Sequence, residues 1–140
     1  MHRSIRTTVR TLAVAGLVFG LAACSEAADK AVDQVDKAVT DTYEVTYEVT
    51  GKNVDSIDYH AGGGTAMEPK IETVQKPTLP WKKTVTLKGI MPPAVMPVAV
   101  DVKGAEVTCS ITYKGEVIKE SKGAGLAAAG GCVAVSPVVE

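Results

Sequence analysis

Arginine is missing from most of this 140-residue chain and occurs only at Arg3, Arg6 and Arg10. The other 12 of its 15 basic residues are lysines, against 16 acidic residues, so the chain after residue 23 carries a formal net charge of −4. A nucleic-acid-binding protein presents a basic face, with arginines that contact bases and phosphates. The composition therefore predicts that this protein binds no nucleic acid.

The chain also has few residues that could act together in catalysis. After residue 2 the only histidine is His60, and no nucleophile motif accompanies it. A catalytic serine or cysteine needs a base and an orienting group around it. The glycine run Gly62–Gly64 is not followed by the GK[ST] residues of a phosphate-binding loop. We therefore predict no enzymatic activity and no cofactor.

One metal site has to be weighed. A soft copper site could join His60 with three methionines, which are Met67, Met91 and Met96. Their spacing is irregular, and two of them lie in a proline-rich segment. We therefore expect no metal site.

The N-terminal region has an apolar run of only nine residues, 12–20. Residues 12–20 are uncharged, follow the arginines and precede Leu21-Ala22-Ala23-Cys24. A basic start, an apolar run too short to span a bilayer comfortably and small residues, in this order, are typical of a secretory signal. The cysteine after them indicates a bacterial lipoprotein, so we predict a signal peptide over residues 1–23 and lipid on Cys24. An ordinary secretory signal with a chance cysteine is the alternative.

Cysteine is rare, and only Cys109 and Cys132 remain after Cys24. An even pair in an exported chain is typical of a disulfide. A metal pair or a redox couple is the alternative, but neither cysteine has a CxxC partner or a nearby histidine. A structural bridge across this loop would contribute about 3 to 3.5 kcal/mol.

The mature chain, residues 24–140, has the length of about one domain. Residues 24–41 contain no glycine, proline or aromatic residue, and the sequence Asp-Lys-Ala-Val recurs in them after seven residues. Their apolar residues follow helical spacing: Ala28, Val32, Val35 and Val39. We predict a charged helical tether over residues 24–41 and a β domain over residues 42–140. A short coiled-coil seam with a partner helix is the alternative for the tether.

From Tyr43 on, the apolar period changes to two, as in half-buried strands. The expected strands cover residues 43–50, 54–59, 71–74, 81–88, 98–102, 107–113, 116–119 and 132–135. Residues 61–65, with the run Gly62–Gly64, are expected to be a flexible loop, and prolines keep residues 92–97 irregular. Short strands with turns between them predict an all-β fold, an immunoglobulin-like antiparallel sandwich, which has about seven strands. Trp81 and the inward faces of the strands would fill its core.

Several short motifs follow one another along the chain. They are Val45-Thr46-Tyr47-Glu48-Val49 with Gly51, then Leu79-Pro80-Trp81, then a CxIxxxG element from Cys109 to Gly115, then Cys132. In this order they resemble the MmpS family, the small mycobacterial membrane proteins that are accessory to MmpL transporters. The resemblance covers about residues 43–135.

The resemblance implies a periplasmic β-sandwich with an internal disulfide and an actinobacterial source. It also implies support for siderophore or lipid export through an MmpL-type pump of the resistance-nodulation-division class. Family members usually keep an uncleaved N-terminal transmembrane helix, where this chain has a lipoprotein signal. We therefore expect a lipid-anchored accessory protein on the extracytoplasmic side of the cell membrane that contacts an MmpL-type transporter. A ligand-binding lipoprotein without a transporter partner is the alternative.

The apolar, proline-rich segment Ile90–Pro97 is the candidate contact surface. Strand pairing is not expected to use its backbone groups. The residues offered for contact are Ile90, Met91, Val95 and Met96. The alternative is a crossover at the edge of the sandwich that packs on its own core.

Overall fold

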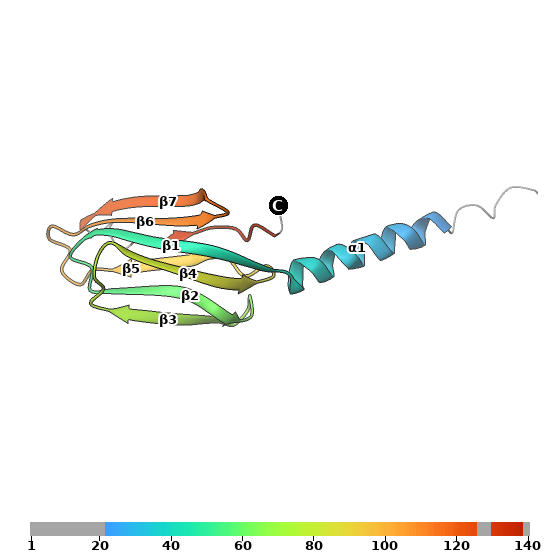
Figure 1. The fold of residues 1–140 in the computed structure, drawn as a ribbon, viewed down its shortest axis with the longest axis horizontal. Coiled ribbons are helices and arrows are strands. Elements are labelled where there is room, and N and C mark those ends of the chain that lie inside the picture. Colours follow the sequence, from blue (N-terminus) through green and yellow to red (C-terminus); the bar gives the residue numbers. More distant parts are fainter. Residues whose placement is uncertain (1–21, 126–129, 139–140) are drawn as a thin grey trace, which may run out of the picture. The chain divides into compact units, whose positions relative to one another are not determined.

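The structure is a computed structural model that describes residues 22–125 and 130–138. The chain divides into two compact units, Met1–Asp33 and Gln34–Glu140. The described residues form one helix and eight strands (Figure 1). Their bounds are α1 Ala22–Thr40, β1 Thr42–Lys52, β2 Ser56–Gly64, β3 Pro69–Gln75, β4 Trp81–Lys88, β5 Ala94–Val98, β6 Glu106–Tyr113, β7 Glu116–Ala124 and β8 Cys132–Val133.

The strands form two four-stranded sheets that pack face to face. The strand order is β4-β1-β6-β7 in the first sheet and β3-β2-β5-β8 in the second. Every neighbouring pair is antiparallel. The prediction of an all-β antiparallel sandwich with a short N-terminal helix is confirmed.

The core lies between the sheets and follows the alternation in the sequence. In β1 the residues Tyr43, Val45, Tyr47 and Val49 are at most 4% exposed, while the polar residues between them face outward. Successive side chains of a strand point to opposite faces, so a period of two buries one whole face. Because β1 is flanked by β4 and β6, its apolar face lies in the middle of the sandwich.

A disulfide joins the two sheets. Cys109 of β6 and Cys132 of β8 are bonded, with their Cα atoms 6.0 Å apart. Both side chains are buried, at 1% and 0% exposure. The bond therefore fixes the short C-terminal strand of one sheet to an inner strand of the other.

The fifth strand lies earlier than the sequence predicted. We expected it over residues 98–102, with irregular structure before it, but β5 is Ala94–Val98. β8 covers only Ala94 and Val95, so Pro97 has no strand beside it on that side of β5. A proline is tolerated there because its missing N–H need break no ladder bond.

Other boundaries also differ from the prediction. The run Gly62–Gly64 belongs to β2 and is not a loop, because Gly64 pairs with Pro69 of β3. Gly62 also lies close to β4, since a Cβ on it would be 2.8 Å from the Thr86 carbonyl oxygen. The hairpin strand β7 is longer than expected, and β8 ends at Val133. Trp81 is half-buried at the rim of the core, with its ring centroid 5.2 Å from that of Tyr59.

Helix α1 begins at Ala22, close to the predicted start of the tether. Val32, Val35 and Val39 are between 53% and 62% exposed. In the described ranges no helix is long and apolar enough to cross a membrane. Residues 1–21 of the predicted signal peptide and the side chain of Cys24 lie outside the described part of the chain.

Candidate functional site

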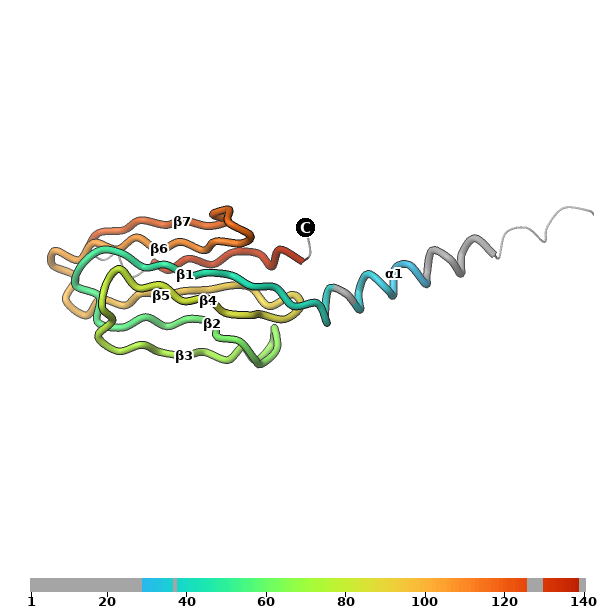
Figure 2. The backbone as a smooth tube through the Cα atoms, viewed as in Figure 1, coloured from blue at the N-terminus to red at the C-terminus, as the bar shows by residue number. Residues whose placement is uncertain are grey.

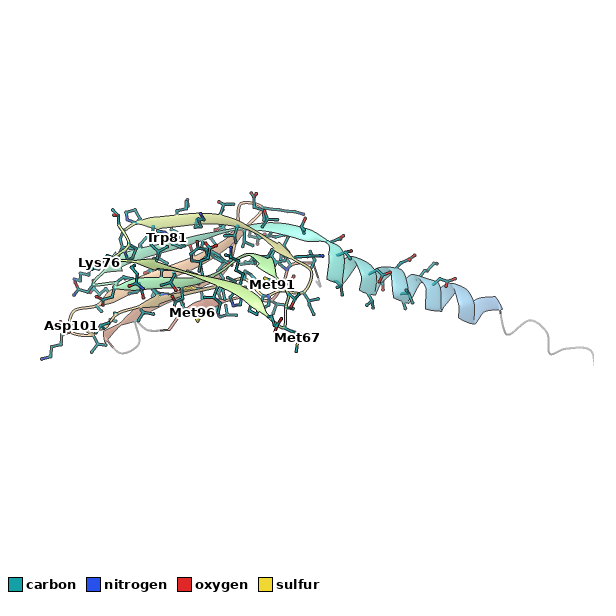
Figure 3. All side chains as sticks on the ribbon, turned by 90° about the horizontal axis from the view of Figure 1, so that it is seen from below. Met67, Lys76, Trp81, Met91, Met96 and Asp101 are labelled. Atoms are coloured by element: carbon teal, nitrogen blue, oxygen red, sulfur yellow. A yellow bond between two sulfur atoms is a disulfide. The ribbon has the colours of Figure 1, made fainter. Side chains whose placement is uncertain are left out.

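Three segments far apart in the sequence meet at one end of the sandwich. They are the last turn of α1, the turn Thr65–Glu68 between β2 and β3, and the turn that follows Lys88 at the end of β4 (Figure 2). We call this end the tether end. Figure 3 shows Met67 and Met91 on this side of the sandwich and Lys76 and Asp101 at the opposite end, the far end.

The turn between β2 and β3 is held by two hydrogen bonds between its own residues Thr65 and Glu68. The amide of Thr65 donates to the Glu68 carbonyl at 3.0 Å, and the amide of Glu68 donates to the Thr65 hydroxyl at 3.1 Å. These bonds leave the side chain of Met67 outside the turn, where it is 91% exposed. An apolar side chain is therefore presented to solvent by an ordered turn.

The turn after β4 is locked to the end of α1. The Gly89 amide donates to the Asp41 carbonyl at 2.7 Å, and the hydroxyl of the buried Ser136 donates to the Gly89 carbonyl at 2.8 Å. Gly89 has φ +60°, and a Cβ there would lie 2.5 Å from the Val39 carbonyl oxygen. Only glycine fits this contact, which places the neighbouring Ile90, 50% exposed, beside the helix end.

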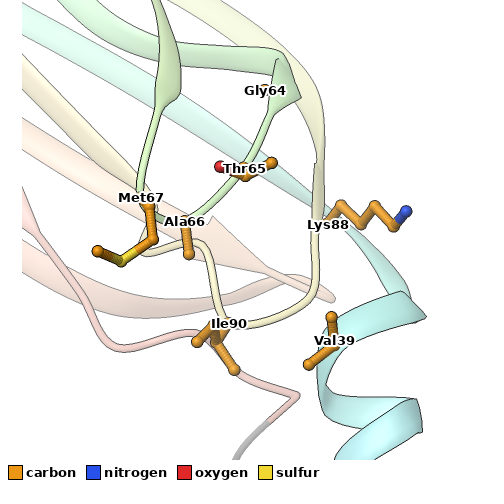
Figure 4. A pocket seen from close by; sticks show the side chains of 7 residues that line it. All are labelled: Val39, Gly64, Thr65, Ala66, Met67, Lys88 and Ile90. Atoms are coloured by element: carbon orange, nitrogen blue, oxygen red, sulfur yellow. The ribbon is translucent and has the colours of Figure 1, made fainter.

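A pocket of about 280 Å³ lies among these segments (Figure 4). We call it the tether-end pocket. Its lining residues are Val39, Gly64, Thr65, Ala66, Met67, Lys88 and Ile90. In Figure 4 Val39, Ala66 and Ile90 lie around the hollow, whereas the side chains of Met67 and Lys88 point away from it. The walls are thus mostly apolar, with one charged side chain.

The tyrosines inside the sandwich serve packing. The Tyr47 hydroxyl donates to the His60 carbonyl at 3.0 Å and accepts from the Ala94 amide at 3.3 Å, and the Tyr43 hydroxyl donates to the Met91 carbonyl. Burial raises the pKa values of both phenols. A phenol with a raised pKa stays neutral, so these hydroxyls are not activated as bases or nucleophiles.

His60 and the methionines do not gather into a metal site. The His60 Nδ1 lies 2.8 Å from the Pro92 carbonyl, which can only accept, so Nδ1 carries the proton. Met91 is fully buried and Met67 is 91% exposed, so their thioethers lie in different environments. Over the described ranges there is also no cluster of three histidine, cysteine or acidic side chains.

The predicted contact segment is mostly internal. Met91 and Val95 are fully buried and Met96 is half-buried, while Ile90 is exposed. The first two are unavailable to a partner because they pack in the core, as the alternative interpretation required. We therefore keep only Ile90 as a candidate contact residue.

The sequence interpretation missed the partners of Ile90 in this surface. Val39 had been assigned to a tether, and Met67 and Lys88 had no role. They come from separate segments and meet only when the sandwich forms. One signal was available, because Ala66 and Met67 are apolar residues between Thr65 and Glu68 in a short turn.

The chain was also compared with known proteins. A search of curated proteins finds no match to it. A family model described as Mycobacterium membrane protein matches residues 5–137. This match spans almost the whole sequence, so the chain belongs to this family of mycobacterial membrane proteins, the MmpS family.

Proposed function

We propose that this protein is a membrane-anchored, extracytoplasmic accessory protein of an MmpL-type transporter. It supports export of a siderophore or a lipid by contact with the transporter and not by catalysis. Membership of the family supports a role at the membrane. The described residues include no cluster of three histidine, cysteine or acidic side chains, which suits a protein that acts by binding.

The observation that carries the proposal is the exposed apolar surface at the tether end. Val39, Met67 and Ile90 are 53%, 91% and 50% exposed and line one pocket. Apolar side chains that cluster on a surface mark interaction sites, whereas single ones need no explanation. This surface surrounds the point where the N-terminal part of the chain enters the sandwich, so it suits contact with a membrane protein.

The anchor is part of the same proposal. Lipid on Cys24 would hold the domain at the membrane after removal of residues 1–23, with residues 24–41 as the tether. Two acyl chains give stable attachment, whereas one chain gives only reversible binding. Cys24→Ser should move the protein from the membrane fraction to the soluble fraction. Equal partitioning of the two proteins into detergent would show that the anchor is not a lipid on Cys24.

The contact is tested by photo-crosslinking in native membranes. A photoreactive amino acid replaces Met67 or Ile90 at the tether end, or Val100 at the far end as the control. Val100 is 80% exposed, so it reports random encounters with neighbours. We expect adducts with a large transporter from the first two positions and none from the third. Adducts of equal yield from all three positions, or none with a transporter, would contradict the proposal.

A ligand-binding lipoprotein is the second candidate function. The tether-end pocket favours it, since ligand sites are apolar hollows with few polar groups. The two functions differ in their need for a transporter. Binding of a small molecule by the isolated protein, with no adduct to a transporter, would favour the second.

A further inference from the structure

We propose that the tether-end pocket binds one alkyl chain of an anionic amphiphile, with Lys88 at the rim beside the anionic head. The site needs no transporter, so the inference stands apart from the proposed function. It concerns the chemistry of the pocket walls, the order of its turns and the charge at its rim.

The walls select an apolar occupant. The side chains that lie around the hollow are mainly those of Val39, Ala66 and Ile90, while Met67 stands at its outer edge (Figure 4). Only two of the seven lining residues, Thr65 and Lys88, have polar side chains. The walls therefore offer few polar side chains to a sugar or a peptide group, which would lose its hydrogen bonds to water with little compensation. A hydrocarbon chain makes no hydrogen bonds to water, so it loses none when it enters the pocket.

The pocket exists before the ligand binds. The Thr65–Glu68 turn closes on itself with hydrogen bonds of 3.0 and 3.1 Å, and Gly89 is bonded to Asp41 and Ser136. Both turns are thus held by bonds that no ligand has to form. A preformed site binds more tightly because little conformational freedom is lost on binding.

The rim selects an anionic head. Lys88 is the one charged residue among the seven that line the pocket. Across the described ranges, four ion pairs occupy Lys52, Lys70, Lys82 and Lys122, and Lys88 is not in them. Lys88 lies at the rim, and its side chain extends outward into solvent (Figure 4). A long, exposed lysine side chain can turn its ammonium toward a carboxylate or phosphate at the exposed end of a bound chain.

The test uses the full-length protein in liposomes of synthetic lipid, so that no transporter is present. The probe is dodecyl phosphate with a diazirine at the end of its alkyl chain, and peptide mass spectrometry locates the label. We expect saturable labelling of peptides that contain residues 65–68 and 89–91. Octyl, decyl and dodecyl phosphate then compete, and at equal free concentration in the water phase each added methylene should strengthen competition about fourfold until the pocket is full.

Matched variants separate the pocket from general surface effects. Ile90→Asp should reduce labelling at least tenfold, and Val100→Asp, the same change at the far end, should not. Ala66→Phe fills the hollow without adding charge, so it should also block labelling if the sandwich remains folded. Lys88→Gln should weaken competition by dodecyl phosphate but not by a dodecyl sugar, whereas Lys119→Gln should change neither.

Three results would overturn the inference. Equal labelling of the Ile90→Asp and Val100→Asp variants would show that the pocket is not the site. Labelling that does not saturate would mean that the turns merely touch the bilayer. Competition that does not depend on chain length would exclude an alkyl chain as the bound group. None of these results bears on adducts with a transporter, which test the proposed function separately.

Discussion

The two ends of the sandwich hold their turns with the same kinds of hydrogen bond but expose different side chains. At the far end Asp55 accepts from the Val100 amide at 2.7 Å, and the Asp55 amide donates to the Val98 carbonyl at 2.8 Å. At the tether end the Gly89 amide donates to the Asp41 carbonyl, and the Ser136 hydroxyl donates to the Gly89 carbonyl. Main-chain groups and polar side chains thus order the turns at both ends, and the apolar side chains in these turns stay available for other contacts.

The two ends differ in how their exposed apolar side chains are grouped. Met67 and Ile90 lie in turns whose order does not depend on their own side chains, and both line one pocket with Val39. At the far end Val100 is exposed as an isolated residue beside charged neighbours. We infer that the tether end combines an ordered backbone with a surface for binding.

The largest expected effect concerns the disulfide that joins the two sheets. Cys132→Ser breaks the bond between β6 and β8 and should lower the free energy of unfolding by about 2–5 kcal/mol. Urea denaturation of the oxidised proteins measures the difference. Two free thiols in protein taken from the cell envelope, or a loss well under this range, would contradict a stabilising bridge.

Two glycines with similar backbone angles, one at each end of the sandwich, allow the two ends to be compared directly. Gly89 has φ +60° and Gly104 has φ +72°, but a Cβ on Gly89 would meet the Val39 carbonyl at 2.5 Å and one on Gly104 would meet Asn53 at 3.7 Å. Gly104→Ala should lower stability by about 1–2 kcal/mol, the cost of a left-handed backbone. Gly89→Ala should lower it by about 2–4 kcal/mol, because the clash adds to that cost.

Thermal and urea denaturation of both alanine variants measure these losses. The excess for Gly89→Ala reports how tightly the turn after β4 is packed on the end of α1. Equal losses would mean that this turn can move away from the helix end. The tether end would then lack the ordered geometry that the binding proposals require.

A smaller loss of stability is expected when a polar side chain that hydrogen-bonds to the backbone is removed at either end. Ser136 is 2% exposed, and without its hydroxyl the Gly89 carbonyl would be left buried and unpaired. Ser136→Ala should therefore lower stability by about 1–3 kcal/mol. Asp55→Ala removes an exposed bond that water can replace, so its loss should stay below about 1 kcal/mol. Urea denaturation curves check the order, and a larger loss for Asp55→Ala would reverse it.

The strands could be predicted from the sequence because their burial repeats within each segment. Tyr43, Val45, Tyr47 and Val49 are buried as the alternation indicated, and the Cys109–Cys132 pair is bonded as expected. The position of β5 could not be predicted in this way. Pro97 argued against a strand, but it lies beyond the two residues that β8 pairs with, and the length of β8 is a property of the tertiary structure.

The candidate site could be predicted only in part. Ile90 was named, but with Met91 and Val95, which the sandwich buries. The side chains that accompany Ile90 are those of Val39, Ala66 and Met67, and they lie more than twenty residues away along the chain. Periodicity describes neighbours within one segment, so it carries no information about turns that meet at one end of a fold.

The smallest expected effect concerns β3, which runs from the tether end to the far end. Glu72 of β3 accepts from the Tyr59 hydroxyl at 2.8 Å and pairs with the Lys70 ammonium at 2.9 Å. The bonds to Lys70 and Tyr59 lower the pKa of the Glu72 carboxyl below its ordinary value of 4.5. The folded state therefore favours the ionised form, and its contribution to stability is present above pH 4.5 and is lost as pH falls through the lowered pKa.

Because this carboxylate is exposed, the effect should be slight and should be screened by salt. We expect the urea midpoint to fall somewhat more between pH 6 and pH 3 in the wild type than in the Glu72→Gln variant. Glu116→Gln, an exposed change in β7, is the control and should follow the wild type. If the urea midpoint falls as much in Glu72→Gln as in the wild type, the acid-sensitive group lies elsewhere in the protein. The carboxylates in the turns at the two ends of the sandwich would then be tested next.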